Sequence, residues 1–143
     1  MGTTERILAL DLGARRIGVA VSDGLGITAQ GLATVERRNR GADLEALRAL
    51  AERYEAAQWL LGLPRHMSGS EGRQAGLVRA WGGALERHTG MPVVYWDERL
   101  TTVEAGRVLR QAGSSRLQTR RAIDRMSAVI LLQSYLDARS HPV

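Results

Sequence analysis

Apolar residues near the N-terminus occur in three short runs, separated by turn residues and by no segment of helical spacing. Runs of this kind predict strands, and three strands joined directly predict an antiparallel meander. The expected strands are Arg6–Asp11, Ile17–Ser22 and Ile27–Val35, with a hairpin turn at Asp23-Gly24 and a weak point in the third strand at Gly31.

Beyond residue 40 the pattern alternates between helical spacing and short buried runs. The first helix has Asp43 as its expected cap, and its apolar positions are Leu44, Leu47, Ala51 and Tyr54. The elements expected after it are strands at Trp59–Leu63 and Val93–Trp96, helices at 73–88, 101–113 and 121–137, and loops at 64–72 and 114–120. This order predicts one α/β domain over residues 1–143. Its mixed five-stranded sheet combines an antiparallel meander with parallel strands and has helices on both faces.

Composition narrows the class of protein. The 143 residues suit a single domain, and the proportions of hydrophobic residues (44%) and charged residues (24%) are those of a soluble globular protein. The chain has no cysteine, which excludes disulfides and thiolate metal sites. No apolar run is long enough to span a bilayer, and the N-terminus lacks the layout of a signal peptide. We therefore expect a cytoplasmic protein with no membrane partner.

Positive charge is concentrated in the last third of the chain. All twenty basic residues are arginine, which codon bias alone can explain. Residues 1–98 carry 12 arginines and 12 acidic residues, whereas residues 99–143 carry 8 arginines and 3 acidic residues. Such asymmetry favours a polyanionic partner, although any single arginine can simply lie on a solvated face. The candidate phosphate contacts are Arg15, Arg99, Arg116, Arg120, Arg121 and Arg125.

Three carboxylates lie at the ends or starts of expected elements. Asp11 closes the first strand, Glu98 follows the strand at 93–96, and Asp124 falls in the first turn of the last expected helix. Acidic side chains are rarely buried unless they are paired or bind a metal. If the three converge, they form an all-oxygen site of the kind that holds Mg²⁺ or Mn²⁺ in enzymes that hydrolyse phosphodiesters.

Each candidate also has a simpler interpretation. Asp11 can be a strand-end turn residue, and Asp124 a first-turn acid that stabilises the helix dipole. Asp97 competes with Glu98, because alternation along a strand puts the two on opposite faces. His66 can act as a general base or be a solvated loop residue. The loop that contains it can hold a phosphate through backbone N–H groups or be a flexible connection.

Four segments, taken together, closely resemble the YqgF/RuvX family. They are Leu8-Ala9-Leu10-Asp11-Leu12-Gly13 through Ile17–Asp23; Gly62-Leu63-Pro64 through Gly69-Ser70-Glu71-Gly72; Trp96-Asp97-Glu98-Arg99-Leu100-Thr101-Thr102; and Asp124 with Ser127-Ala128 and Leu132–Leu136. The segments span nearly the whole chain. In two places the chain is more basic than the family pattern, namely at Arg15-Arg16 and at Arg65-His66.

The resemblance implies an RNase H-like fold and a nuclease, described either as a Holliday-junction resolvase or as an enzyme of pre-16S rRNA maturation. It implies that Asp11, Glu98 and Asp124 are the metal-binding catalytic carboxylates, with Glu98 preferred over Asp97, and that two Mg²⁺ or Mn²⁺ ions are the cofactor. It also implies possible ribosome-associated factors as partners.

RNA is the favoured substrate. A resolvase must cut two strands symmetrically and so needs a dimer, and the sequence has no heptad seam or wide apolar stripe for one. Branched DNA remains the alternative, and the chain is expected to be a monomer or a homodimer. An actin-like phosphotransferase also carries an Asp-x-Gly turn, but it needs two such lobes. A non-catalytic nucleic-acid-binding module is the alternative of another class.

Overall fold

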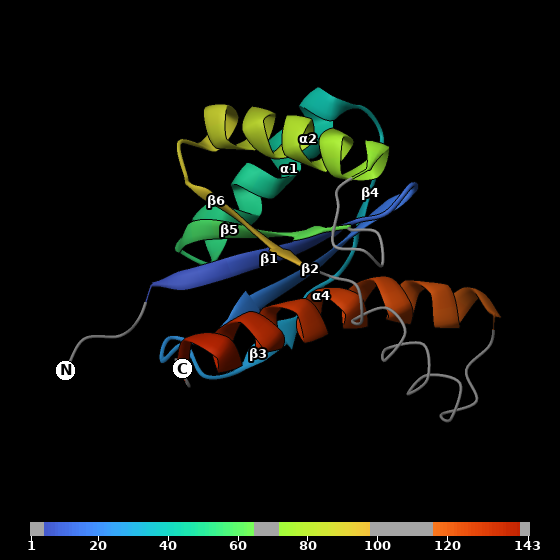
Figure 1. The fold of residues 1–143 in the computed structure, drawn as a ribbon. Helices are drawn as coiled ribbons and strands as arrows, with labels where there is room; N and C mark the ends of the chain where they lie inside the picture. Colours follow the sequence, from blue (N-terminus) through green and yellow to red (C-terminus); the bar gives the residue numbers. More distant parts are fainter. Residues whose placement is uncertain (1–4, 65–71, 98–115, 141–143) are drawn as a thin grey trace.

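The computed structural model describes residues 5–64, 72–97 and 116–140, and for residues 116–125 and Ser140 it describes the backbone alone. These residues form a three-layer sandwich in which a single mixed sheet separates α1 and α2 from α4 (Figure 1). The strands are β1 (Arg6–Leu12), β2 (Arg16–Ser22), β3 (Ala29–Gly31), β4 (Val35–Glu36), β5 (Ala56–Leu63) and β6 (Val93–Asp97). The helices are α1 (Arg40–Arg53), α2 (Arg73–Thr89) and α4 (Arg116–Ser140).

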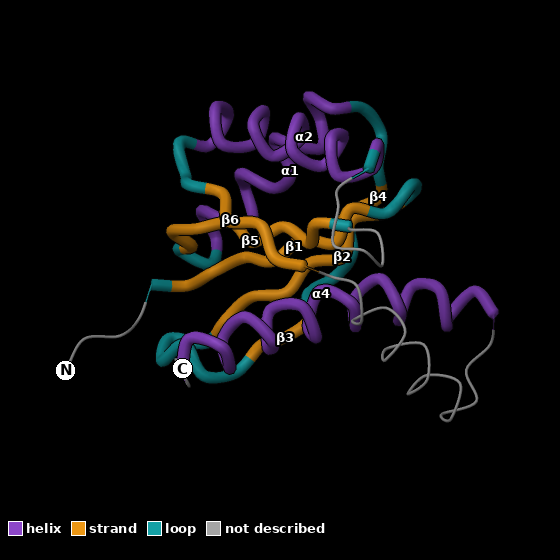
Figure 2. The backbone as a smooth tube through the Cα atoms, in the orientation of Figure 1, coloured by secondary structure: helices purple, strands orange, loops and turns teal. Residues whose placement is uncertain are grey.

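The sheet combines an antiparallel half with a parallel half, as predicted. Its strand order is β3-β2-β1-β5-β6, with β4 also paired to β2 (Figure 2). Strand β2 is antiparallel to β1 and β3, whereas β5 is parallel to both β1 and β6. The parallel pairs need crossover connections, and α2 supplies the one between β5 and β6. The RNase H-like fold class is therefore confirmed.

Two separate apolar cores hold the three layers together. On the first face, which we call the α1–α2 face, Leu8, Leu10 and Leu61 pack with residues of α1 and α2 such as Leu47. On the opposite face, which we call the α4 face, the side chains of Ile7, Ala9, Ala20 and Leu60 pack with Ala128, Leu131, Leu132 and Leu136 of α4. Because both faces are covered, the central strands are apolar at nearly every position.

The third expected strand, Ile27–Val35, is wrong as a continuous element. Strand β3 pairs with residues 20–22 of β2, and β4 pairs with Arg16 and Ile17, so the chain leaves the ladder between them. Between β3 and β4, the Leu32 N–H still donates a backbone hydrogen bond to the Val19 carbonyl. The interruption begins after Gly31, whose missing side chain weakens a strand. The sheet therefore has six strands rather than five.

Two helix starts also differ from the prediction. The cap of α1 is Asn39, whose side chain accepts a hydrogen bond from the Ala42 N–H, and Asp43 instead lies buried in the first turn. Helix α4 begins at Arg116, so residues 116–120 are helical rather than a loop. Nothing in the sequence from Arg116 to Arg125 breaks a helix, since the stretch contains neither glycine nor proline. The helix expected at 101–113 lies outside the described residues.

Most other boundaries lie within one residue of the expected ones, but β5 begins three residues early, at Ala56, and α4 ends three residues late, at Ser140. Helix α2 ends at Gly90, which adopts the left-handed conformation (φ 71°) that favours glycine at this position. Trp59 and Trp81 are buried, as expected of core residues, while Trp96 is half-buried and stacks edge-on against Tyr135 of α4. Among the described helices, none is long and apolar enough to cross a membrane.

Helix α2 approaches β6 very closely at one position. Gly82 is buried, and a Cβ atom there would overlap the Tyr95 hydroxyl, 3.1 Å from Tyr95 Cζ and 3.2 Å from Leu61 Cδ2. The Tyr95 hydroxyl donates a hydrogen bond to the Arg79 carbonyl at 3.4 Å, and the Arg79 guanidinium lies 4.8 Å from the ring centroid. The absence of a side chain at Gly82 therefore lets α2 pack against β6.

Candidate active site

Strands β1, β5 and β6 are parallel, so their last residues lie at the same end of the sheet, which we call the carboxyl end. The ends are Leu12, Leu63 and Asp97. Ligand and catalytic sites of α/β proteins gather where such strands end, because the loops that follow them converge there. Asp11 is the penultimate residue of β1, and Glu98 would follow β6 directly.

Asp11 projects toward the α4 face. Side chains alternate along a strand, and Asp11 shares its parity with Ile7 and Ala9, both of which pack against α4. In the register of the sheet its partner on β2 is Gly18, and Gly62 lies on the other side, one residue beyond the Leu10–Leu61 pair. Asp11, which is itself partly buried, thus has a glycine directly beside it on each neighbouring strand.

Asp97 projects toward the opposite face. Its register partner is Leu63, and the corresponding pairs Trp59–Val93 and Leu61–Tyr95 all belong to the α1–α2 core. Parallel partners in one register lie on the same face of a sheet. Asp97 is therefore on the far side of the sheet from Asp11. This result favours Glu98 as the site residue, although Glu98 itself lies outside the described residues.

Helix α4 runs antiparallel to β1, so its first half lies toward the carboxyl end (Figure 1). Near its other end, Gln133 holds the β2–β3 hairpin, accepting from the Ala29 N–H at 3.0 Å and donating to the Ile27 carbonyl at 2.9 Å. Asp124 is eight residues beyond the first residue of α4, more than two turns at 3.6 residues per turn. It is therefore not a first-turn acid, and that alternative is excluded.

The helix position of residue 124 lies one turn before Ala128, which packs against the sheet. Residues four apart fall on the same face of a helix. Position 124 is thus on the stripe of α4 that continues toward the carboxyl end, on the same face of the sheet as Asp11. The Asp124 side chain is outside the described part of the structure.

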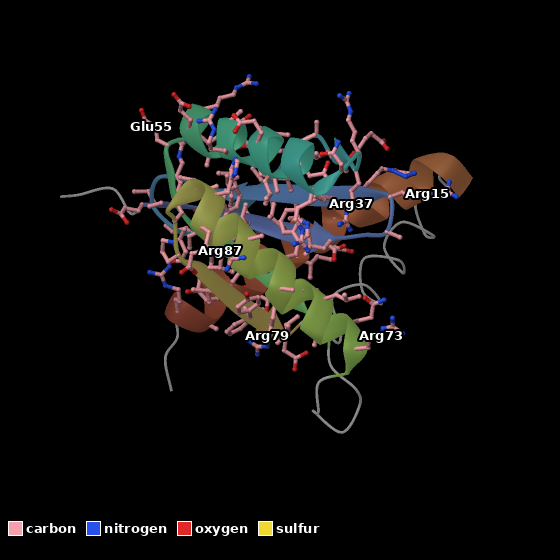
Figure 3. The ribbon with its side chains drawn as sticks, turned by 90° about the horizontal axis from the view of Figure 1, so that it is seen from above. Arg15, Arg37, Glu55, Arg73, Arg79 and Arg87 are labelled. Atoms are coloured by element: carbon pink, nitrogen blue, oxygen red, sulfur yellow. The ribbon has the colours of Figure 1, made fainter. Side chains whose placement is uncertain are left out.

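The predicted phosphate contacts fall into three groups. Arg15 is exposed in the β1–β2 turn, and Figure 3 shows it on the side of the molecule where α4 begins. Arg116, Arg120, Arg121 and Arg125 lie in the first three turns of α4, with only their backbone described, while Arg99 and His66 lie outside the described residues. No group of three potential metal ligands occurs among the described side chains, which include just one of the three predicted carboxylates.

The turn after Asp11 is tightly closed. The Gly13 N–H is directed at two carbonyls, that of Asp11 at 3.1 Å and that of Arg16 at 2.9 Å. A Cβ atom at Gly13 would lie 2.6 Å from the Arg16 carbonyl oxygen, so only glycine fits without a shift of the backbone. Two residues that the sequence did not indicate as part of the site are connected to this turn. Arg37 donates a hydrogen bond to the Gly13 carbonyl, and Asp43 forms an ion pair with Arg37.

Relatives of the chain carry nuclease names. A protein of Moorella thermoacetica, named as a pre-16S rRNA nuclease, is 54% identical over 132 residues, which are 92% of this chain and 94% of the relative. A protein of Heliobacterium modesticaldum with the same name is 47% identical over 136 residues, 95% of this chain and 91% of the relative. These similarities agree with the nuclease that the sequence predicts.

Solved structures of resolvases have the same fold. Thermus thermophilus RuvC in complex with a Holliday junction aligns with a TM-score of 0.59 at 12% identity, covering 96% of both chains. The Fowlpox virus resolvase, also solved with junction DNA, aligns with a TM-score of 0.60 at 12% identity, covering 95% of this chain and 99% of the viral protein. The family model described as RuvX, Holliday junction resolvase, matches residues 5–138. The chain therefore belongs to the RuvX family of nucleases.

Proposed function

We propose that the chain is a cytoplasmic, divalent-metal-dependent nuclease that hydrolyses RNA in the maturation of the 5′ end of pre-16S rRNA. The observation that carries the proposal is the position of Asp11 at the carboxyl end of β1, facing α4 between Gly18 and Gly62. The choice of RNA rests on the curated relatives of similar length, which are named for pre-16S rRNA.

Asp11, Glu98 and Asp124 are proposed as the metal ligands. All three are carboxylates, and oxygen ligands of this kind suit Mg²⁺ and Mn²⁺. The residues directly beside Asp11 on β2 and β5 are Gly18 and Gly62, which place no side chain of their own next to the carboxylate. If alternation continues one residue past β6, Glu98 shares the α4 face with Asp11. When bound, the ions supply an activated water and neutralise charge on the phosphate.

The charge at the start of α4 supports a polyanionic substrate. The first turn of α4 contains no acidic residue, and Arg116, Arg120 and Arg121 lie within its first two turns. Cations at a helix N-terminus are unfavourable, because that end of the helix carries partial positive charge. A phosphate backbone bound there would relieve the repulsion, because both the arginines and the N–H groups of a helix N-terminus attract phosphate. Arg15, exposed in the β1–β2 turn, adds a further positive charge on the side of the molecule where α4 begins (Figure 3).

A Holliday-junction resolvase is the second candidate, because the family model carries that description. The same carboxylates would serve both reactions. A resolvase must nick two strands symmetrically, which requires two active sites related by a dimer axis. The products therefore distinguish the two functions.

The proposal is tested by cleavage of three end-labelled substrates: an unstructured RNA, a pre-16S rRNA 5′ fragment and a four-way DNA junction. Each is incubated with Mg²⁺, Mn²⁺ or EDTA. We expect metal-dependent cutting of the RNA fragments and no paired nicks in the junction. Symmetric nicks in the junction would establish the resolvase instead. Binding with no cleavage of any substrate in either metal would identify a non-catalytic module.

A further inference from the structure

Arg37 binds both ends of the turn that follows β1. Its side chain donates from Nη1 to the Gly13 carbonyl at 2.8 Å, and its backbone N–H donates to the Arg15 carbonyl at 2.9 Å. Arg37 is placed to do so because it follows β4, whose Glu36 pairs with Arg16 across the ladder. A residue 24 positions away in sequence therefore holds the backbone of residues 13–15.

Asp43 forms an ion pair with the side chain of Arg37. Its Oδ2 lies 3.9 Å from Arg37 Nε, and its Oδ1 accepts a hydrogen bond from the Arg38 N–H at 3.0 Å. The Asp43 side chain is 4% exposed, whereas that of Arg37 is 31% exposed. A buried carboxylate is costly unless it is paired and hydrogen-bonded. The pairing explains why an acid is tolerated inside the first turn of α1, where it is not the cap.

This pair is connected to Asp11 through the backbone of Gly13. The Gly13 carbonyl accepts from Arg37, and the Gly13 N–H is directed at the Asp11 carbonyl at 3.1 Å. Arg37 itself lies on the other face of the sheet from the Asp11 carboxylate. It lines a cleft of about 190 Å³ with Leu12 and Trp81, and both of these belong to the α1–α2 core or pack against it.

We propose that Arg37 and Asp43 are positioning residues that fix the 11–13 turn and so hold the Asp11 carboxylate in the geometry that binds the metal. This inference rests on the proposed function, because it takes Asp11 to be a metal ligand. Removing a residue that orients a metal ligand without binding the metal commonly lowers metal affinity or activity by about 10–100-fold. Neither residue needs to touch RNA.

The test compares Arg37→Gln, Arg37→Lys and Asp43→Asn with the parent protein. Asp43→Asn keeps an oxygen for the Arg38 N–H and removes only the charge that faces Arg37. The control is Arg38→Gln, which removes the same charge from the neighbouring exposed residue. Three quantities are measured: Mn²⁺ affinity by calorimetry, kcat and KM for RNA cleavage, and the melting temperature, which shows that each variant is folded.

We expect Arg37→Gln and Asp43→Asn to weaken Mn²⁺ binding about 10-fold or more and to lower kcat by a similar factor. KM for RNA should stay within about threefold of the parent value, Arg37→Lys should recover part of the loss, and Arg38→Gln should behave as the parent does.

Two results would overturn the proposal. In the first, folded Arg37→Gln protein keeps its Mn²⁺ affinity and kcat within about twofold, so that Arg37 only stabilises the fold. In the second, KM rises while Mn²⁺ affinity is unchanged, so that Arg37 contacts RNA. Failure of the proposed function appears in the parent protein itself, as absence of Mn²⁺-dependent cleavage. If the parent also fails to bind Mn²⁺, the positioning role is excluded as well. If the parent binds Mn²⁺ without cleaving RNA, the Mn²⁺ affinities of the variants still test the positioning role.

Discussion

Asp11→Asn is expected to lower the rate of metal-dependent RNA cleavage by about 100-fold or more, equivalent to about 2.7 kcal/mol in the activation free energy. The substitution keeps the size of the side chain and removes the negative charge that Mg²⁺ and Mn²⁺ require. Asp11 lies at the end of β1, facing α4, with Gly18 and Gly62 beside it.

The measurement is single-turnover cleavage of end-labelled RNA at a fixed Mn²⁺ concentration, with the affinity for RNA measured separately in EDTA. A matched control is Asp23→Asn, the same chemical change in the β2–β3 turn at the other end of β2, where Asp23 accepts a hydrogen bond from the Ile27 N–H at 2.8 Å. The control should cleave at the parent rate. If Asp11→Asn retains more than about a tenth of the parent rate, Asp11 is not the metal ligand that we propose.

Gly82→Ala is expected to destabilise the protein by about 1–3 kcal/mol, the usual cost of forcing a methyl group into a packed core. The added Cβ would overlap the Tyr95 hydroxyl and press on Leu61. For a domain of this size, such a change lowers the melting temperature by several degrees, at about 2–4 °C for each kcal/mol. Thermal unfolding followed by circular dichroism measures the change.

The matched control is Gly76→Ala in the same helix, where no atom lies within 4 Å of the added Cβ. There the higher helix propensity of alanine should stabilise the protein by about 0.5–1 kcal/mol. Tyr95→Phe removes the atom nearest to the added methyl group, so the double variant with Gly82→Ala should lose less stability than the sum of the single variants. Equal melting temperatures for Gly82→Ala and Gly76→Ala would show that α2 and β6 adjust without cost.

Local sequence patterns were sufficient to predict the order of the described elements, apart from the break between β3 and β4. The meander follows from short apolar runs separated by turn residues such as Asp23-Gly24, and the end of α2 follows from Gly90. These features depend on residues that are neighbours in sequence, and their periodicity is that of the element itself. The end of β1 could be predicted to within one residue for the same reason, since the strand expected to end at Asp11 ends at Leu12.

The choice between Asp97 and Glu98 could not be made from the local pattern. Residues 93–96 are all apolar because both faces of β6 are covered, so alternation does not show which face is which. The register of β6 with β5 places Asp97 beside Leu63 on the α1–α2 face, which favours Glu98, although Glu98 itself lies outside the described residues. Register is a tertiary property that one strand does not encode alone.

Arg37 and Asp43 were missed for a related reason. Asp43 stands where a cap was expected, because Asp is a common cap, but Asn39 begins the helix four residues earlier and leaves Asp43 to pair with Arg37. The contact from Arg37 to Gly13 spans 24 residues and joins β4 to the β1–β2 turn. An arginine in a basic stretch gives no sequence indication that its side chain is held by a buried acid.

The location of the metal site on the α4 face is tested most directly by the Mn²⁺ affinities of Glu98→Gln and Asp97→Asn, measured by calorimetry beside the parent protein. Because side chains alternate along a strand, these two adjacent acids are expected on opposite faces of the sheet. We expect Glu98→Gln to weaken Mn²⁺ binding about 10-fold or more, and Asp97→Asn to stay within about threefold of the parent. If Asp97→Asn weakens binding as much as Glu98→Gln does, or if neither changes it, a metal site formed with Asp11 on the α4 face is contradicted.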